Sequence, residues 1–188
     1  GAKEYFGLLR RLFKPPVDGQ TWGFERRAYY PPPDPINALL SFSYSMLLRD
    51  VTTACELIGI DPYIGFFHVI DYGRPSMALD LMEEFRPIVA DSIVLEAVNR
   101  PYVGLRDFEI VDLSEAEEER PADQEPRSST QAVYLAREGR EKLIQLYETR
   151  VNAQVFASAN GERVSYRALF QLQAQKMARF ILGEARQY

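Results

Sequence analysis

Apolar side chains recur at helical spacing through most of this 188-residue chain, and this spacing constrains its fold more than any other feature. Between Tyr5 and Phe13 they occur three and four residues apart, so that they share one face of a helix. The same period extends from Ile36 to about Ile58 and from Ser76 to about Asn99. The pattern predicts an all-α, multi-helix domain over residues 1–188, which is a common length for one domain.

The ends of the longest predicted helix follow from its flanking residues. The Asp34 carboxylate can accept free backbone N–H groups, and Pro35 at the first helical position loses no hydrogen bond. Gly59 can adopt the left-handed conformation in which many helices end. We therefore expect a helix from Ile36 to about Ile58.

Other segments carry weaker signals. Ser76 is a candidate cap for the helix that follows it, and Ser165 is one for the last helix, Tyr166–Arg186. Residues 114–130 have almost no apolar content, so we expect a mobile acidic loop there. The remaining predicted elements are a short hairpin near Trp22–Tyr30, a short helix at Tyr63–His68, an extended segment at Asp107–Leu113 and a helix at Ala132–Tyr147.

The charges occur in blocks along the chain. The total of 22 basic and 27 acidic residues, a net charge of −5, by itself argues against a nucleic-acid partner. However, residues 1–49 carry a net +3 and residues 131–188 a net +4, whereas residues 50–111 carry −7 and residues 112–130 carry −5. Basic ends around an acidic middle suit a protein that binds phosphates and gathers carboxylates around a metal, although many uneven surfaces look the same.

The composition also excludes several classes of protein. Cys55 is the only cysteine, which excludes an internal disulfide framework and a thiolate zinc cluster and favours a reducing compartment, the cytoplasm. Its position in a buried helix favours an inert core thiol. The longest apolar run, around Ile64–Ile70, is too short to span a membrane, and charged residues interrupt the first segment, so we expect neither a membrane span nor a signal peptide.

His68 is the only histidine, and a histidine in an apolar run is more often a core residue than a ligand. The next predicted helix changes this balance, because Asp80, Glu83 and Glu84 are three and four residues apart and Asp80 shares a face with either Glu. Carboxylate oxygens together with one imidazole nitrogen would suit a divalent cation. The structural alternative is a solvated acidic face paired with nearby arginines.

Five stretches of the sequence resemble one protein family. They are PPPDPINALLSFSYSMLL (31–48), GIDPYIGFFH (59–68), GRPSMALDLMEEFRPIVADSIV (73–94), EGREKLIQLYETR (138–150) and VSYRALFQLQAQKMARFILGE (164–184). In order and distance they are similar to the CRISPR-associated adaptation integrase, the metal-dependent endonuclease that inserts new spacers into CRISPR arrays. The resemblance implies that this chain is the C-terminal all-helical domain, without the family's N-terminal β domain.

The resemblance also implies a metal site made of a Glu, a His and a second acid, with Mg²⁺ or Mn²⁺ as the cation. His68 matches the histidine, Glu83 matches the second acid, and Asp80 matches an additional acidic position one turn earlier. The family's first Glu matches no residue here and would lie just upstream of Gly1. We therefore expect this chain to lack one of three ligands and to be inactive by itself.

The family reaction is the attack of a DNA 3′-hydroxyl on a phosphodiester of the repeat. The implied partners are double-stranded and partly single-stranded DNA, a second copy of the chain, and the small second adaptation protein of the CRISPR system. Basic side chains are the expected contacts to DNA phosphates. The candidates are Arg26, Arg27, Arg74, Arg86, Arg163, Arg167, Lys176 and Arg179. For Arg74 and Arg86, an ion pair with Asp80 or Glu84 is an equal expectation.

Two alternatives to an integrase stay open. A non-catalytic helical module that binds DNA or a protein would use the basic ends and need no metal. A metallohydrolase acting on small molecules is disfavoured by the same basic flanks. Mn²⁺-dependent thermal stabilisation that disappears in Glu83→Ala would separate the integrase from the module.

Overall fold

The computed structural model describes residues 1–17, 19–68, 72–113, 131–156 and 161–185. The chain divides into two compact units, each built from two stretches of sequence. Unit 1 is Gly1–Ser43 with Ser92–Leu146, and unit 2 is Tyr44–Asp91 with Tyr147–Tyr188. Helices predominate in both, as the apolar spacing predicts. Within the described ranges, no helix has the length and apolar content that a membrane crossing requires.

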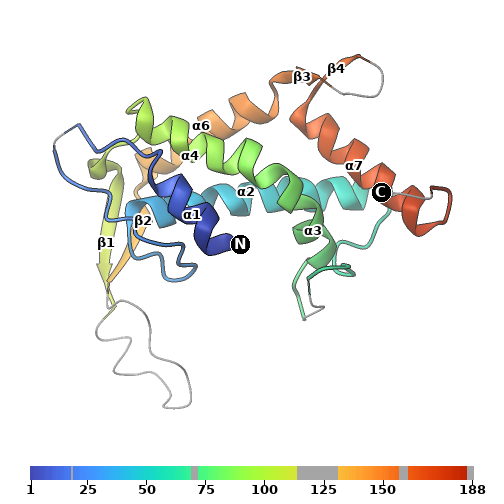
Figure 1. Cartoon of the computed structure of the whole chain (residues 1–188), viewed down its shortest axis with the longest axis horizontal. Helices are drawn as coiled ribbons and strands as arrows, with labels where there is room; N and C mark the ends of the chain where they lie inside the picture. The colour runs from blue at the N-terminus through green and yellow to red at the C-terminus, as the bar shows by residue number, and fades with distance from the viewer. Residues whose placement is uncertain (18, 69–71, 114–130, 157–160, 186–188) are drawn as a thin grey trace, which may run out of the picture. The chain divides into compact units, whose positions relative to one another are not determined.

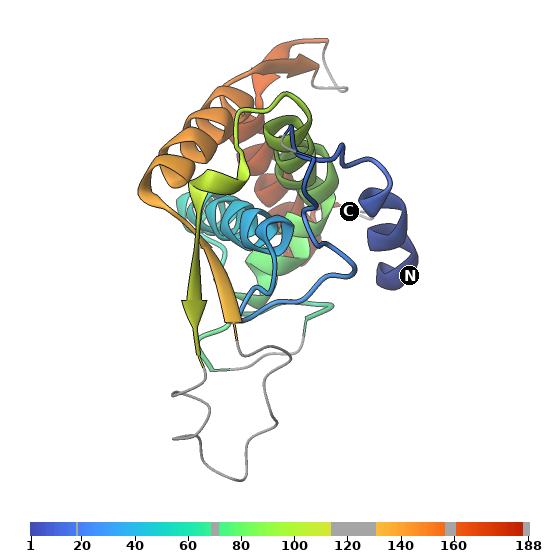
Figure 2. The ribbon, with the colours of Figure 1, turned by 90° about the vertical axis from the view of Figure 1, so that its left-hand side faces the viewer.

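Unit 1 combines helices with one antiparallel ribbon (Figure 1). Its elements are α1 (Ala2–Arg10), the first part of α2 (Pro35–Ile58), α4 (Ser92–Asn99), the 3-10 turn η2 (Leu105–Asp107), β1 (Phe108–Asp112), β2 (Gln131–Leu135) and the first part of α6 (Arg137–Val151). Strands β1 and β2 lie side by side in Figure 2, with Ile110 opposite Val133. The predicted extended segment at 107–113 is therefore confirmed.

The helix predicted from Ala132 is wrong at its start, because residues 131–135 form β2 and α6 begins only at Arg137. The Val133 N–H donates to the carbonyl oxygen of Pro32 at 2.8 Å, and β1 pairs along the other edge of the strand. Both partners come from distant parts of the chain. Their hydrogen bonds outweigh the helical spacing of the local apolar residues.

The start of α2 agrees with its prediction. Asp34 Oδ1 accepts the Asn37 N–H at 2.8 Å, and Gly59, with φ of +85°, follows the last helical residue. The predicted hairpin near Trp22–Tyr30 is wrong, since the described residues 22–30 contain no strand. That segment is held instead by the Arg27 guanidinium, which donates to Asn37 Oδ1 at 2.9 Å and to Ser41 Oγ at 3.0 Å on α2.

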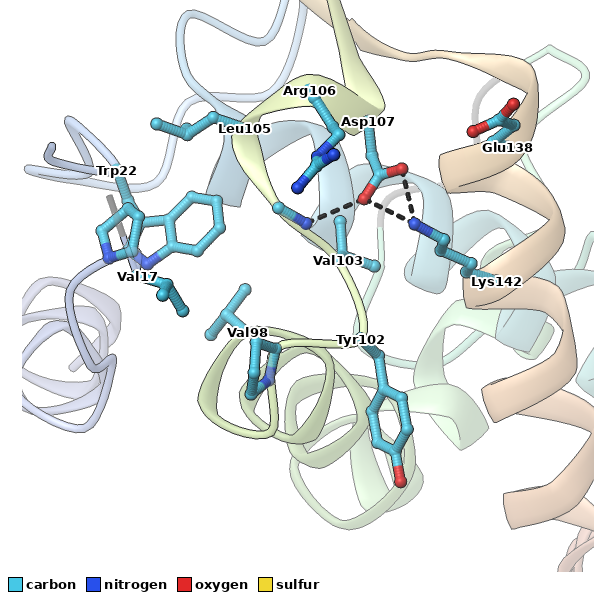
Figure 3. Close-up of a pocket in the computed structure, with 13 residues that line it drawn as sticks. Val17, Trp22, Val98, Tyr102, Val103, Leu105, Arg106, Asp107, Glu138 and Lys142 are labelled. Carbon is cyan, nitrogen blue, oxygen red and sulfur yellow. Dashed lines mark hydrogen bonds and ion pairs between the residues drawn. The ribbon is translucent and has the colours of Figure 1, made fainter. Parts of the chain in front are cut away.

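A buried ion pair joins η2 to α6. The Asp107 side chain is 2% exposed and accepts hydrogen bonds from the Gly104 N–H at 2.8 Å and from Lys142 Nζ at 2.7 Å (Figure 3). A Cβ at Gly139 would lie 2.5 Å from the Asp107 carbonyl oxygen, so only glycine permits α6 to pass so close. Gly104, Asp107 and Lys142 line a pocket of about 530 Å³, together with Trp22. None of the residues predicted to bind metal or DNA lines this pocket.

Unit 2 contains the segment on which the predicted metal ligands lie. Its elements are the rest of α2, α3 (Ser76–Phe85), the π-helical turn η1 (Arg86–Asp91), the end of α6, β3 (Gln154–Phe156), β4 (Arg163–Ser165) and α7 (Tyr166–Ile181) (Figure 1). The predicted helix from Ser76 to Asn99 is helical throughout but widens to a π turn at η1. Pro87 lies in this turn and has no N–H to donate to a carbonyl one turn earlier.

Capping in unit 2 agrees only in part with the predictions. Ser165 caps α7, because its Oγ accepts the Ala168 N–H at 3.2 Å, although α7 ends at Ile181. Ser76 is not a cap but the first residue of α3. The Pro62 carbonyl oxygen takes that role and accepts the Met77 N–H at 2.9 Å. The predicted acidic loop at 114–130 lies outside the described residues.

The short helix predicted at Tyr63–His68 is wrong, because this segment forms turns and bends. Asp61 Oδ1 accepts the Tyr63 N–H at 2.9 Å, which begins a turn instead of a helix. The N–H groups of residues 66–68 donate to a side chain of α3 and not to carbonyls one turn earlier. This replacement of helical hydrogen bonds is what positions the histidine.

Candidate metal and nucleic-acid site

Asp80 anchors the segment that carries His68. Its Oδ2 accepts the N–H groups of Phe66 at 2.6 Å and Phe67 at 2.9 Å. Its Oδ1 accepts the His68 N–H at 3.0 Å and lies 2.5 Å from the imidazole Nδ1. The Asp80 side chain is 2% exposed, whereas that of His68 is 25% exposed. One buried carboxylate therefore fixes three consecutive backbone groups and one face of the imidazole.

The charge state of Asp80 follows from the same contacts. Burial raises the pKa of its carboxyl, but the hydrogen bonds from the Phe67 N–H, the His68 imidazole and the Phe66 N–H outweigh burial, and the net pKa is lowered. An ionised carboxylate beside Nδ1 favours the form of His68 in which Nδ1 carries a proton. Nε2 is then the nitrogen that can bind a metal. This arrangement makes Asp80 a positioning residue.

Gly65 permits the close approach of this segment to α3. A Cβ at residue 65 would lie 2.6 Å from the backbone carbonyl carbon of Ser76 and 2.8 Å from Asp80 Oδ2. No larger residue fits without moving the segment away from the carboxylate. Gly65 is not among the residues predicted from the sequence, although a glycine three residues before the histidine in an otherwise apolar run was the available signal.

Glu83 lies one turn after Asp80 on α3, and its side chain is 43% exposed. Its Oε1 accepts a hydrogen bond from Arg86 Nη1 at 2.6 Å. The Arg86 guanidinium also lies 5.5 Å from the centre of the Tyr44 ring. Arg86 was expected to pair with Asp80 or Glu84, but the ion pair that it forms is with Glu83. Arg86 follows Glu83 by three residues on the same helical face, while Asp80 is enclosed by backbone donors.

The donor atoms of His68 and Glu83 suit a hard divalent cation, since imidazole nitrogen and carboxylate oxygen are ligands of Mn²⁺ and, for the oxygen, of Mg²⁺. Across the part of the chain that the structure describes, no group of three or more His, Cys, Asp or Glu side chains is placed to hold a metal ion. His68 and Glu83 therefore supply donor types that such a cation accepts, but the described residues do not form a complete metal site.

The basic residues predicted to contact DNA differ in their exposure and in the contacts that they already make within the protein. Arg26 in unit 1 is exposed, but the Arg27 guanidinium bonds to α2 and lies 4.6 Å from the centre of the Tyr29 ring. In unit 2, Arg74 and Lys176 are exposed. Arg163 and Arg179 are exposed as well, and Arg179 Nε lies 3.9 Å from a Glu184 oxygen.

Arg167 belongs to a polar network inside unit 2. Its Nη2 donates to Glu148 Oε1 at 2.8 Å, and its Nε donates to Asp50 Oδ2 at 3.1 Å. The hydroxyl of Tyr147, a fully buried residue, donates to the same Asp50 oxygen at 2.9 Å. The hydrogen bond from Arg167 lowers the pKa of Glu148. The guanidinium thus links α2, α6 and α7, a role that was not predicted from the sequence.

Cys55 agrees with its interpretation as an inert core thiol. Its side chain is fully buried, and burial, followed by the neighbouring Glu56 charge, raises the pKa of the thiol to about 11. A thiol with such a pKa carries almost no thiolate at neutral pH.

The fold and the site define a mostly helical domain in which the buried Asp80 carboxylate orients the partly exposed His68. A second, exposed carboxylate, that of Glu83, lies one helical turn after Asp80. The profile of the family described as CRISPR associated protein Cas1 matches residues 1–149. The chain belongs to this family and corresponds to its C-terminal part, as the sequence resemblance implied.

Several curated relatives match the whole chain, and two of them illustrate the similarity. The CRISPR-associated endonuclease Cas1 3 of Thermus thermophilus is 36% identical over 187 residues, which are 100% of this chain and 49% of the relative. The CRISPR-associated exonuclease Cas4/endonuclease Cas1 fusion of Geobacter sulfurreducens is 36% identical over 189 residues, 100% of this chain and 30% of the relative. The chain thus spans between about a third and a half of the length of these relatives.

Solved structures share the fold. A Cas1 protein from Thermotoga maritima has a TM-score of 0.77 and 25% identity, and the match covers 97% of this chain and 50% of that one. A casposase bound to an integration product has a TM-score of 0.78 at 20% identity, over 99% of this chain and 46% of the other. The prediction of a helical C-terminal domain is therefore confirmed.

Proposed function

We propose that this chain is the catalytic part of a metal-dependent DNA endonuclease and integrase that inserts new spacers into a CRISPR array, by attack of a DNA 3′-hydroxyl on a repeat phosphodiester. Membership of the Cas1 family supports this activity, since curated relatives are named endonucleases. The observation that carries the choice of residues is the 2.5 Å contact between His68 Nδ1 and Asp80 Oδ1, which aims Nε2 away from the buried carboxylate.

In this proposal His68 and Glu83 hold Mg²⁺ or Mn²⁺, and the cation supplies polarisation of the phosphodiester and charge stabilisation at the leaving oxygen. Asp80 keeps the proton on Nδ1 and holds the imidazole in place. Arg74 and Arg86 bind oxygens of the neighbouring phosphates through their planar guanidinium groups. The third ligand, a Glu in the family pattern, matches no residue here, so we propose that this chain is inactive by itself.

Substitution of the two ligands tests the assignment. His68→Ala and Glu83→Ala in the full-length protein should each abolish integration of a DNA end with a 3′-hydroxyl. Glu84→Gln is the matched control, because Glu84 neighbours Glu83 but its Oε2 accepts a hydrogen bond from Gln173 Nε2 at 2.5 Å. Wild-type integration by either alanine variant would overturn the assignment. Metal-dependent nicking by the 188-residue chain alone would contradict its proposed inactivity.

We also propose that the partners are double-stranded and partly single-stranded DNA, a second copy of the chain and the small second adaptation protein, Cas2, and that the protein acts in the cytoplasm. Similarity in fold to a Cas6-RT-Cas1–Cas2 complex and to a casposase bound to an integration product supports Cas2 and DNA as partners. Besides Arg86, the proposed phosphate contacts are the exposed basic residues Arg26, Arg74, Arg163, Lys176 and Arg179. Neutralising one such contact should reduce the salt dependence of DNA affinity by about one unit of log–log slope.

One observation favours the alternative, a non-catalytic module that binds DNA or protein. Glu83, a proposed metal ligand, already forms an ion pair with Arg86 at 2.6 Å. Thermal unfolding separates the two functions. Stabilisation of the full-length protein by Mn²⁺ that disappears in Glu83→Ala supports the metal site, and equal melting temperatures with and without Mn²⁺ support the module.

A further inference from the structure

Phe66 and Phe67 are adjacent in the sequence, but their rings have different surroundings. The Phe66 ring packs edge-to-face against Phe180 of α7, with 6.4 Å between ring centres, and lines an apolar groove with Ile64 and Ile181. The Phe67 side chain is 89% exposed and, within the described part of the chain, packs against no other aromatic ring. Phe67 therefore leaves nearly its whole apolar surface in water, next to the histidine of the proposed site.

The backbone that carries the Phe67 ring is nevertheless fixed. Its N–H donates to Asp80 Oδ2 at 2.9 Å, and the N–H groups on either side, of Phe66 and His68, donate to the same carboxylate at 2.6 and 3.0 Å. The Phe67 backbone cannot move away from His68 without breaking these hydrogen bonds, so only rotation of the side chain changes the position of the ring. A ring held in this way loses little backbone entropy when it binds a ligand.

Single exposed apolar side chains are common, so exposure alone assigns no role to Phe67. The second observation is that Asp80 fixes both Phe67 and the His68 imidazole. Because Phe67 and His68 are neighbours in a fixed backbone, a DNA strand whose phosphate reaches His68 passes close to residue 67, within reach of a base of the same or the next nucleotide. In a duplex the base faces are covered by their neighbours, whereas an unpaired end exposes them.

We infer that Phe67 stacks on an unpaired nucleobase at the DNA end that reaches His68, and so positions that end for the reaction. The inference rests on the proposed function, because it requires a DNA strand at His68. Stacking on an aromatic ring is tolerant of base identity, since every base has a flat π face. Phe67 would therefore hold the strand end without selecting its sequence.

Fluorescence of a base analogue tests the stacking directly. The probe is a duplex with a 3′ overhang whose terminal nucleotide is 2-aminopurine, a base that loses fluorescence when it stacks. It is mixed with the full-length protein in the absence of divalent cations, so that binding is measured without reaction. The variants are Phe67→Ala and Phe67→Tyr, and the control is Ile110→Ala, which removes a side chain of β1 that is 69% exposed.

Wild type, Phe67→Tyr and Ile110→Ala should quench the probe, and Phe67→Ala should not. Phe67→Ala should also bind the overhang roughly tenfold more weakly, while its affinity for blunt duplex DNA and its melting temperature stay unchanged. With an abasic terminal nucleotide, wild type and Phe67→Ala should bind equally.

Two results would overturn the inference while leaving the proposed function intact: full quenching by Phe67→Ala, or equal weakening on overhang and blunt DNA. A loss of self-association in Phe67→Ala without a change in quenching would assign the ring to a protein contact and overturn it too. If wild type binds none of these DNAs, the proposed function fails, and this inference fails with it.

Discussion

His68 Nδ1 lies 2.5 Å from Oδ1 of Asp80, a side chain that is only 2% exposed. The same carboxylate accepts the N–H groups of Phe66, Phe67 and His68. The orientation of the imidazole and the shape of the segment before it therefore depend on one group. A change at Asp80 should affect stability and metal binding together, whereas a change at a ligand that only contacts metal should affect metal binding alone.

Asp80→Asn should lower the free energy of unfolding by about 1–3 kcal/mol at neutral pH, because the amide NH₂ cannot accept the hydrogen bonds that a carboxylate oxygen accepts. It should also weaken Mn²⁺ binding by the full-length protein roughly 10- to 100-fold, since His68 loses its orienting partner. Urea unfolding and Mn²⁺-dependent melting temperatures measure the two effects. Unchanged stability would show that the carboxylate does not anchor the segment.

The stability difference between wild type and Asp80→Asn should depend on pH with a defined sign. The pKa of Asp80 is lowered on folding from its ordinary value of 3.8, so the unfolded state binds the proton more readily. The stability that the carboxylate contributes is complete above the unfolded-state pKa and is lost as the pH falls through the folded-state pKa. Unfolding measured from pH 7 to 3 should show the difference shrinking below about pH 4. A difference that grows on acidification would contradict this assignment.

Gly65→Ala should destabilise the protein by about 1–3 kcal/mol, because its Cβ would lie 2.6 Å from the Ser76 backbone and push the segment off Asp80. Stabilisation by Mn²⁺ should be lost with it. Gly7→Ala is the control, since a Cβ at residue 7 of α1 meets nothing within 4 Å and should be neutral or stabilising. Equal melting temperatures for the two variants would refute the close-approach argument.

Arg167→Met and Lys176→Met should have opposite effects. Arg167 is bound to Glu148 and Asp50, so its loss should cost about 1–2 kcal/mol of stability and leave the salt dependence of DNA affinity unchanged. Lys176 is exposed on the same helix, so its loss should spare stability and reduce the salt dependence. Chemical unfolding and DNA binding at several salt concentrations distinguish the two. The reverse pattern would make Arg167 the DNA contact.

Arg86→Met should strengthen Mn²⁺ binding by the full-length protein up to about fivefold, because a partly exposed ion pair of about 0.2–1 kcal/mol no longer competes for Glu83. Titration of the melting temperature with Mn²⁺ measures the effect. The double variant Glu83→Ala/Arg86→Met is the control and should show no response. Weaker Mn²⁺ binding by Arg86→Met would mean that Arg86 holds Glu83 in its ligating position.

The predictions that agreed best with the structure are those of helix ends, which depend on residues close by in the sequence. Asp34 at the start of α2, Gly59 after its end and Ser165 at the start of α7 all act within three residues of the backbone groups they affect. Strand β2 was mistaken for helix because its partners, β1 and the Pro32 carbonyl, lie outside any local window. Periodicity alone does not show such partners.

The sequence by itself determined the helical fold class, the caps of the long helices, and His68 and Glu83 as the residue types suited to a cation. These depend on spacing along one helix and on the chemistry of single side chains. Only the tertiary structure decided that Asp80 anchors the histidine segment and that Arg86 pairs with Glu83. The physical reason is that the hydrogen-bond partners of Asp80 lie 12 to 14 residues away in the sequence. They reach its buried carboxylate only because Gly65 has no side chain to prevent the close approach of the two segments.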